Sequence, residues 1–221
     1  MLLSLLGSSD PKIAVISILL TVPAVMLALT VHETAHGYIA YKLGDPTARN
    51  LGRLTLNPLK HLDLVGTLAM LIAGYGWAKP VPINTRYFKN PRKGMALTAL
   101  AGPVSNLILA FVGLILYVTV DRLAFYAQIS SIYIYVLEVF LYNFIYLNTV
   151  LAVFNLIPIP PFDGSRIFYV FLPEKAYFAI MKYEQYIMIA VIVAFAIGIF
   201  DITPIVDIVI SGMIKLVGLF I

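Results

Sequence analysis

The stretch Val31-His32-Glu33-Thr34-Ala35-His36-Gly37 (V-H-E-T-A-H-G) ends a long apolar run and contains the pattern H-E-x-x-H. On a helix, residues four apart share a face, so His32 and His36 can both reach one metal ion. Glu33 can then lean toward water held by that ion. Zinc lowers the pKa of such water from 15.7 to about 7, and a carboxylate beside it can take the proton and later return it to a leaving amine. The stretch therefore indicates metal-assisted peptide hydrolysis.

The alternative interpretation is a pair of core histidines on a buried helix. Two imidazoles and a carboxylate in a lipid-facing helix are costly to bury unless a partner such as a metal compensates, so the metal site is favoured. The chain has no cysteine, and any further ligand must therefore be His, Asp or Glu.

The composition indicates an integral membrane protein. Hydrophobic residues make up 61% of the chain and charged residues 12%, against about 25% charged in soluble domains. The length suits one membrane-embedded domain over 1–221, with a core at 11–170 and C-terminal helices at 185–221. The net charge of +4 does not indicate nucleic acid. Because the basic residues stand in loops, the expected partner for them is the lipid bilayer.

The apolar runs predict an all-α polytopic fold with about five to six membrane helices. The expected spans are 11–43, 94–120, 132–157 and 185–200, while 201–221 either spans or lies in the interface. The run 64–73 is too short to span and is interpreted as a re-entrant segment. The stretches 53–56 and 81–84 predict a small β-edge or loop region at the cytoplasmic face.

Basic residues predict the orientation in a cell membrane. Nine of the fifteen Lys and Arg residues lie between Lys42 and Lys93, and Arg166, Lys175 and Lys182 follow the motif that ends at 164. The positive-inside rule places both regions in the cytoplasm, joined by two crossings. The N-terminus is then outside, and the chemical motifs lie toward the cytoplasmic side.

A catalytic zinc ion usually takes three protein ligands and leaves a fourth position for water. The candidates for the third ligand are Asp45, His61, Asp63 and Asp163. Asp45 fits a turn after a helix, and Asp63 can cap the segment that follows it. Asp163 stands in a proline-stiffened break after a membrane helix, where irregular backbone is tolerated if it lines a cavity or is packed in protein. A turn aspartate at the membrane edge is the alternative for Asp163, and His61 also remains possible.

An ordered set of motifs resembles the site-2 proteases, intramembrane zinc metalloproteases, and in particular their short prokaryotic branch without a PDZ domain. The set covers about residues 25–170 and consists of these pieces: H-E-x-x-H at 32–36, G-D-P-T-A at 44–48, G-R-L-T-L-N-P at 52–58, G-W-A-K-P-V-P-I-N at 76–84, A-G-P-V-S-N at 101–106 and N-x-x-P-x-P-P-x-D-G at 155–164.

The resemblance implies one zinc ion bound by His32, His36 and Asp163, with Glu33 as the general acid and base. It also implies that Asn155 helps to position substrate or stabilise an oxyanion, and that Asn106 acts likewise. For both asparagines the alternative is an interhelical hydrogen bond. The implied substrate is a transmembrane segment of another membrane protein. A metal-binding membrane transporter or a proteolytically inactive relative is the alternative function, and the oligomeric state is open.

Overall fold

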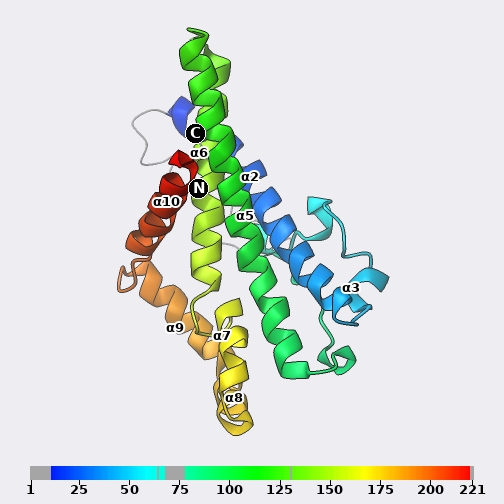
Figure 1. Cartoon of the computed structure of the whole chain (residues 1–221). Helices are drawn as coiled ribbons and strands as arrows, with labels where there is room; N and C mark the ends of the chain where they lie inside the picture. Colours follow the sequence, from blue (N-terminus) through cyan, green and yellow to red (C-terminus); the bar gives the residue numbers. More distant parts are fainter. Residues whose placement is uncertain (1–10, 64, 68–77, 130, 220–221) are drawn as a thin grey trace.

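The structure is a computed structural model that describes residues 11–63, 65–67, 78–129 and 131–219. Three long helices form its body: α2 (Pro11–Lys42), α5 (Pro91–Tyr126) and α6 (Ile132–Asn155). Figure 1 shows α5 and α6 running side by side over most of their length, with α2 crossing beside them. These three helices are long and apolar enough to cross a membrane.

Short elements surround the long helices. They are α3 (Thr47–Asn50), η1 (Pro58–Lys60), η2 (Thr85–Tyr87), α7 (Asp163–Phe168), η3 (Tyr169–Phe171), α8 (Glu174–Met181), α9 (Glu184–Ala196) and α10 (Thr203–Gly218). α10 packs against α6 and α5. Its Met213 and Val217 join Ala110, Leu114 and Ile145 in a buried apolar cluster. Because α5 and α6 meet closely at Gly113, a side chain there would press on Phe144.

Several helix ends follow local sequence signals. Gly44, with φ of 107°, ends α2 in a conformation that favours glycine. Asn90 caps α5 by accepting a hydrogen bond from the Lys93 N–H, and Pro91 occupies its first turn. Ser131 caps α6 in the same way.

The membrane helices differ from the prediction in length. α5 continues through Asp121 and Arg122 to Tyr126, since neither residue interrupts a helix, and it begins three residues before the predicted start. The count of five to six membrane helices is not confirmed. α9 has 13 residues and α10 has 16, fewer than the roughly 20 that a helical span needs.

The predicted β-edge is absent from the described residues. Neither 53–56 nor 81–84 forms a strand there, and the only bridge described is an isolated antiparallel one between Leu62 and Ala78. The physical reason is that the N–H groups of Val81 and Asn84 bond to side chains instead of to a second strand. Most of the proposed re-entrant run 64–73 lies outside the described residues.

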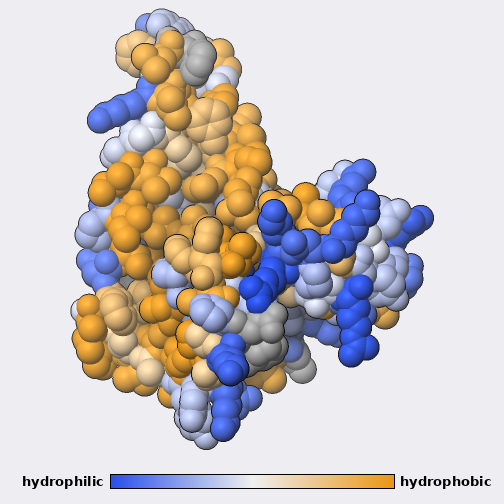
Figure 2. Space-filling model, turned by 60° about the horizontal axis from the view of Figure 1, so that its bottom comes forward, coloured by the Kyte–Doolittle hydropathy of each residue, from blue (hydrophilic) through white to orange (hydrophobic). Residues whose placement is uncertain are grey.

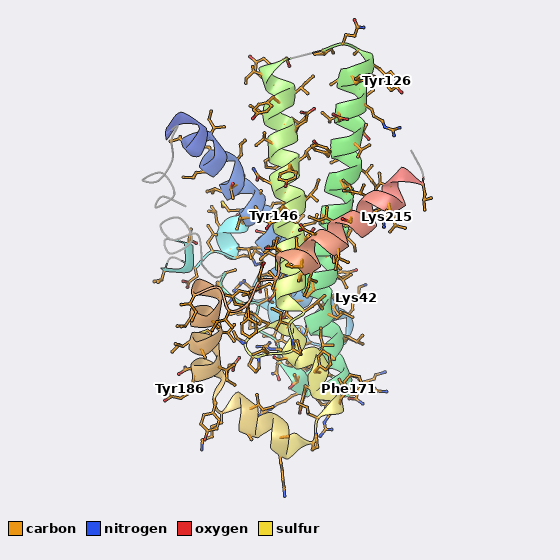
Figure 3. All side chains as sticks on the ribbon, turned by 90° about the vertical axis from the view of Figure 1, so that its left-hand side faces the viewer. Lys42, Tyr126, Tyr146, Phe171, Tyr186 and Lys215 are labelled. Carbon is orange, nitrogen blue, oxygen red and sulfur yellow. The ribbon has the colours of Figure 1, made fainter. Side chains whose placement is uncertain are left out.

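Polar and apolar surfaces are separated along the molecule. Figure 2 shows hydrophobic residues covering the helical body, and hydrophilic residues gathered on the lobe that lies beside it. Exposed basic residues of the loops between α2 and α5 include Lys42, Arg49, Lys60, Lys79, Arg86 and Lys89. In Figure 3, Tyr126 marks one end of the molecule and Phe171 lies near the other, with Lys42 toward the Phe171 end. The C-terminal part of α2 and the segment after α7 therefore lie toward the same end.

Candidate metal centre

Three side chains from two distant parts of the chain meet at one point. The Nε2 atoms of His32 and His36 are 3.0 Å apart, and each lies 3.1 Å from Oδ2 of Asp163. Both histidines stand on one face of α2, and Asp163 is the first residue of α7. The two histidines are 5% and 6% exposed, so this meeting point is buried.

The other nitrogen of each imidazole faces a hydrogen-bond acceptor. Nδ1 of His32 lies 2.6 Å from Oδ1 of Asn106, and Nδ1 of His36 lies 2.7 Å from the carbonyl oxygen of Thr98. Each Nδ1 must therefore carry the proton, which leaves the lone pair of each neutral Nε2 directed at the meeting point. Two lone pairs and a carboxylate oxygen in mutual contact repel one another unless a cation lies among them.

The donor set fits zinc. Tetrahedral ligands about 2.0–2.1 Å from one ion are about 3.4 Å apart, close to the separations in this triangle. Within the described residues, one group of three His, Asp or Glu side chains is close enough to hold an ion, and it is this one. His₂Asp also leaves one of four positions for water, as catalytic zinc sites do.

Asp163 brings a carboxylate oxygen, Oδ2, to the two Nε2 atoms. The following residue, Gly164, permits this position. A side chain there would lie 2.4 Å from the carbonyl oxygens of Leu156 and Ile157, so the turn into α7 cannot admit one.

Glu33 lies in the same cavity as the donor set. The cavity is about 170 Å³ and is lined by His32, Glu33, His36 and Asp163 together with Asn155, Arg166 and others. Oε2 of Glu33 accepts a hydrogen bond of 2.8 Å from the N–H of Val81. Because Pro80 and Pro82 have no N–H, Val81 supplies the one backbone donor of this Pro-Val-Pro segment.

The loop that carries Val81, which we call the 79–84 loop, is attached to charged side chains at three points. Arg53 donates from Nη2 to the Lys79 carbonyl oxygen (2.6 Å), Val81 donates to Glu33, and Asn84 donates its N–H to Oδ2 of Asp45 (2.6 Å). Asp45 is fully buried, and Arg53 is 8% exposed. The sequence motifs did not predict this arrangement, because the loop contributes only backbone atoms to the three contacts.

The other candidates for the third ligand lie elsewhere. Asp45 also accepts from the N–H of Thr47, which makes it the turn residue expected from its position. Asp63 accepts from the N–H of Gly66. Nε2 of His61 lies 2.9 Å from the Thr55 carbonyl oxygen. None of these three residues belongs to the group formed by His32, His36 and Asp163.

The two predicted asparagines occupy different places. Asn155 lines the cavity, and its Nδ2 donates to the Leu151 carbonyl oxygen at 3.0 Å. The amide nitrogen of Asn106 donates to Ala28 and Asn148, while its oxygen faces His32. Asn106 thus has no N–H left for an oxyanion and serves as an interhelical contact that also touches a histidine of the donor set.

Gly102 completes the wall behind the histidines. A side chain at this position of α5 would lie 2.4 Å from Nε2 of His36 and 2.5 Å from Cε1 of His32. α5 can therefore approach the imidazoles only because Gly102 has no side chain. The G-P-x-x-N motif signalled the position, but its physical reason required the packing of α5 on α2.

A buried His₂Asp set beside a glutamate, in a molecule with three described helices of membrane-spanning length, is typical of a helical membrane metalloprotein. Residues 123–199 match the model of peptidase family M50. "Putative zinc metalloprotease YwhC" of Bacillus subtilis is 46% identical over 77% of this chain and 77% of its own length. "Putative zinc metalloprotease Rip2" of Mycolicibacterium smegmatis is 31% identical over 66% of this chain and 54% of its own length.

An archaeal protein is also similar: "Putative zinc metalloprotease MJ0611" of Methanocaldococcus jannaschii is 29% identical over 72% of this chain and 74% of its own length. No solved structure matches the chain. The chain belongs to peptidase family M50, the site-2 protease family. The segment 123–199 that matches the family model contains Asp163 but not the H-E-x-x-H stretch, so this match and the meeting of the two in space are separate observations.

Proposed function

We propose that this chain is a zinc-dependent endopeptidase that cleaves transmembrane segments of other membrane proteins. In this proposal His32, His36 and Asp163 hold one zinc ion, and Glu33 is the general acid and base. The observation that carries it is the triangle of two Nε2 atoms and a carboxylate oxygen, with both Nδ1 atoms facing acceptors. The family and the names of the relatives support the same chemistry.

A bound zinc ion would supply a Lewis acid and lower the pKa of water in the cavity to about 7. Glu33 performs the proton transfers. The N–H of Val81 holds its Oε2, and Oε1 makes no hydrogen bond within the described part of the chain. Oε1 is thus the atom that takes a proton from water and later donates it to the departing nitrogen. Asn155 lines the same cavity, and in this proposal the Nδ2 hydrogen that does not bond to Leu151 is donated to a substrate carbonyl.

The membrane context favours a transmembrane substrate. His32 and His36 lie ten and six residues before the end of α2, which is about 9–15 Å inside that end. The exposed basic residues of the loops lie just beyond it, and they support the proposal, through the positive-inside rule, that this end faces the cytoplasm. A substrate helix hides its backbone in hydrogen bonds, so it must unwind locally before its carbonyl can reach the cavity.

The alternative of a metal transporter lacks a comparable observation. A transport path needs successive ligand groups along the membrane helices, and the described residues contain a single such group. Asn148, one of the polar residues on α6 that such a path would use, is fully buried against Asn106. A proteolytically inactive relative would have lost Glu33 or a ligand, and all four residues are present.

The test is Glu33→Gln in purified protein reconstituted with a single-span substrate. We expect proteolysis to fall about 10²–10⁴-fold, the usual contribution of a general acid or base, while zinc content measured by metal analysis stays at that of the unmodified protein. Glutamine still accepts from the Val81 N–H, so the loop contact is preserved. Glu138→Gln, on α6, is the matched control and should retain full activity. Full activity of Glu33→Gln would contradict the proposal.

A further inference from the structure

The two histidines of the donor set are oriented by different kinds of acceptor. His36 faces the backbone carbonyl of Thr98, which can only accept a hydrogen bond. His32 faces the side-chain amide of Asn106. The oxygen and nitrogen ends of an amide have nearly the same shape but opposite hydrogen-bonding roles. The tautomer of His32 therefore depends on which end of Asn106 points at it.

Asn148 is placed to decide that orientation. Nδ2 of Asn106 donates to Oδ1 of Asn148 at 2.9 Å, and a longer contact of 3.2 Å joins it to the Ala28 carbonyl oxygen. Asn148 in turn donates from Nδ2 to the Phe144 carbonyl oxygen at 2.8 Å, which turns its own oxygen toward Asn106. Every hydrogen bond in this series has one consistent direction, from His32 on α2 through Asn106 on α5 to Asn148 on α6.

The complete burial of the two hydrogen-bonded asparagines indicates that they do more than fill space between the helices. Asn106 and Asn148 are both 0% exposed, on helices whose other buried residues are mostly apolar. A buried amide stabilises a fold only when its hydrogen bonds are made, and an apolar pair of similar shape would fill the same space. Neither asparagine lines the cavity, so each acts through His32.

We propose that Asn148 is a positioning residue of the metal site. It keeps the oxygen of Asn106 toward Nδ1 of His32, so that the proton stays on Nδ1 and the lone pair of Nε2 stays directed at His36 and Asp163. His36 needs no such residue, because a backbone carbonyl cannot turn over. The inference rests on the proposed zinc site for its consequence, but the hydrogen-bond series can be tested without metal.

The experiment compares Asn148→Leu with the double variant Asn106→Asp/Asn148→Leu and with the control Asn143→Leu, a half-buried asparagine on the same helix. Zinc affinity is measured by competition with a chelator. The tautomers are read by ¹⁵N NMR of metal-free protein labelled at histidine, at a pH about two units above the ordinary imidazole pKa of about 6.5. Single His→Gln variants assign the signals of the three histidines.

In Asn148→Leu we expect zinc affinity to fall about 10–100-fold and the Nδ1–H form of His32 to decrease, with the His36 signal unchanged. In the double variant a carboxylate has no N–H to present, so the Nδ1–H form should return. Asn143→Leu should match the unmodified protein. A role in packing alone would not be rescued by Asn106→Asp.

An unchanged His32 signal in Asn148→Leu would overturn the proposal, as would failure of the double variant to restore it. If Asn148→Leu does not fold, Asn148→Asp takes its place. It still accepts from Asn106, so we expect the original His32 tautomer, and loss of that tautomer would also count against the proposal. Should the unmodified protein bind no zinc, the proposed function fails, and the NMR comparison still decides the role of Asn148.

Discussion

The cavity has two walls, and they are built in different ways. The helix wall consists of α2, α5 and α6. Asn106 and the carbonyl oxygen of Thr98 contact the two histidines, Asn148 contacts Asn106, and Gly102 leaves room for the imidazoles. The loop wall is the 79–84 loop, and its contact to Glu33 is a backbone N–H. The helix wall thus orients the two histidines of the donor set, and the loop wall orients Glu33, the proposed general acid and base. Changes in the two walls should therefore affect different steps.

The largest effect should come from the helix wall. Gly102→Ala places a methyl group 2.4–2.5 Å from the two imidazoles, so the rings must move apart. We expect zinc affinity to fall at least about 100-fold and proteolysis to be lost with it. Gly212→Ala in α10 is the matched control, since nothing lies within 4 Å of the added carbon. It should bind zinc normally and be equally or slightly more stable. Equal zinc binding by the two variants would show that α5 does not press on the site.

A smaller effect is expected from the loop wall. Val81→Pro removes the N–H that holds Glu33, a hydrogen bond to a charged group worth about 1.5–3 kcal/mol. We expect the cleavage rate to fall about 10–100-fold, with zinc content unchanged by metal analysis. A loss of zinc in this variant would mean that the two walls do not act separately.

Ile83→Pro is the companion to Val81→Pro, because the Ile83 N–H makes no hydrogen bond within the described residues. If an unwound substrate pairs with the loop as an added strand, this variant slows cleavage too. Near-normal cleavage would mean that the loop only covers the mouth of the cavity. Val81→Pro by itself cannot separate these possibilities, since it also releases Glu33.

The smallest effect concerns an anchor of the loop. Asp45→Ala removes a fully buried acceptor and leaves the N–H of Asn84 without its partner, which should lower the free energy of unfolding by about 1–3 kcal/mol. We expect less than a tenfold loss of cleavage rate and no loss of zinc. Thermal unfolding in detergent measures the change in stability, and the cleavage assay measures the change in rate. Asp63→Ala, which removes only a local cap on Gly66, should leave the cleavage rate unchanged. An equal loss in both variants would argue against a specific anchor at Asp45.

The sequence predicts much of the helix wall and little of the loop wall. Spacing placed His32 and His36 on one face of a helix, and the family resemblance supplied Asp163, because both kinds of signal are carried by side-chain identity. The resemblance left the place of Asn106 open, since only the packing of three helices shows which atom of its amide meets which neighbour.

The loop contacts could not be predicted in the same way. These contacts use the backbone N–H of Val81 and the backbone carbonyl of Lys79. Almost every residue has both groups, so no sequence motif shows which of them will make a contact. The stretch 81–84 looked like a strand edge because its residues favour extended backbone. Extended backbone is present without a partner strand, and its donors bond to Glu33 and Asp45. The predicted span 94–120 is shorter than α5 because the charged pair Asp121–Arg122 follows it, although neither residue interrupts a helix.

The three attachments of the 79–84 loop have a consequence for how this segment can vary. Since Arg53, Glu33 and Asp45 all meet main-chain atoms, many exchanges of side chain at 79 and 81 leave those contacts in place. Inserting or deleting a single residue would instead move at least one attachment point out of register with its partner. The constraint on this segment therefore falls on its length rather than on its composition.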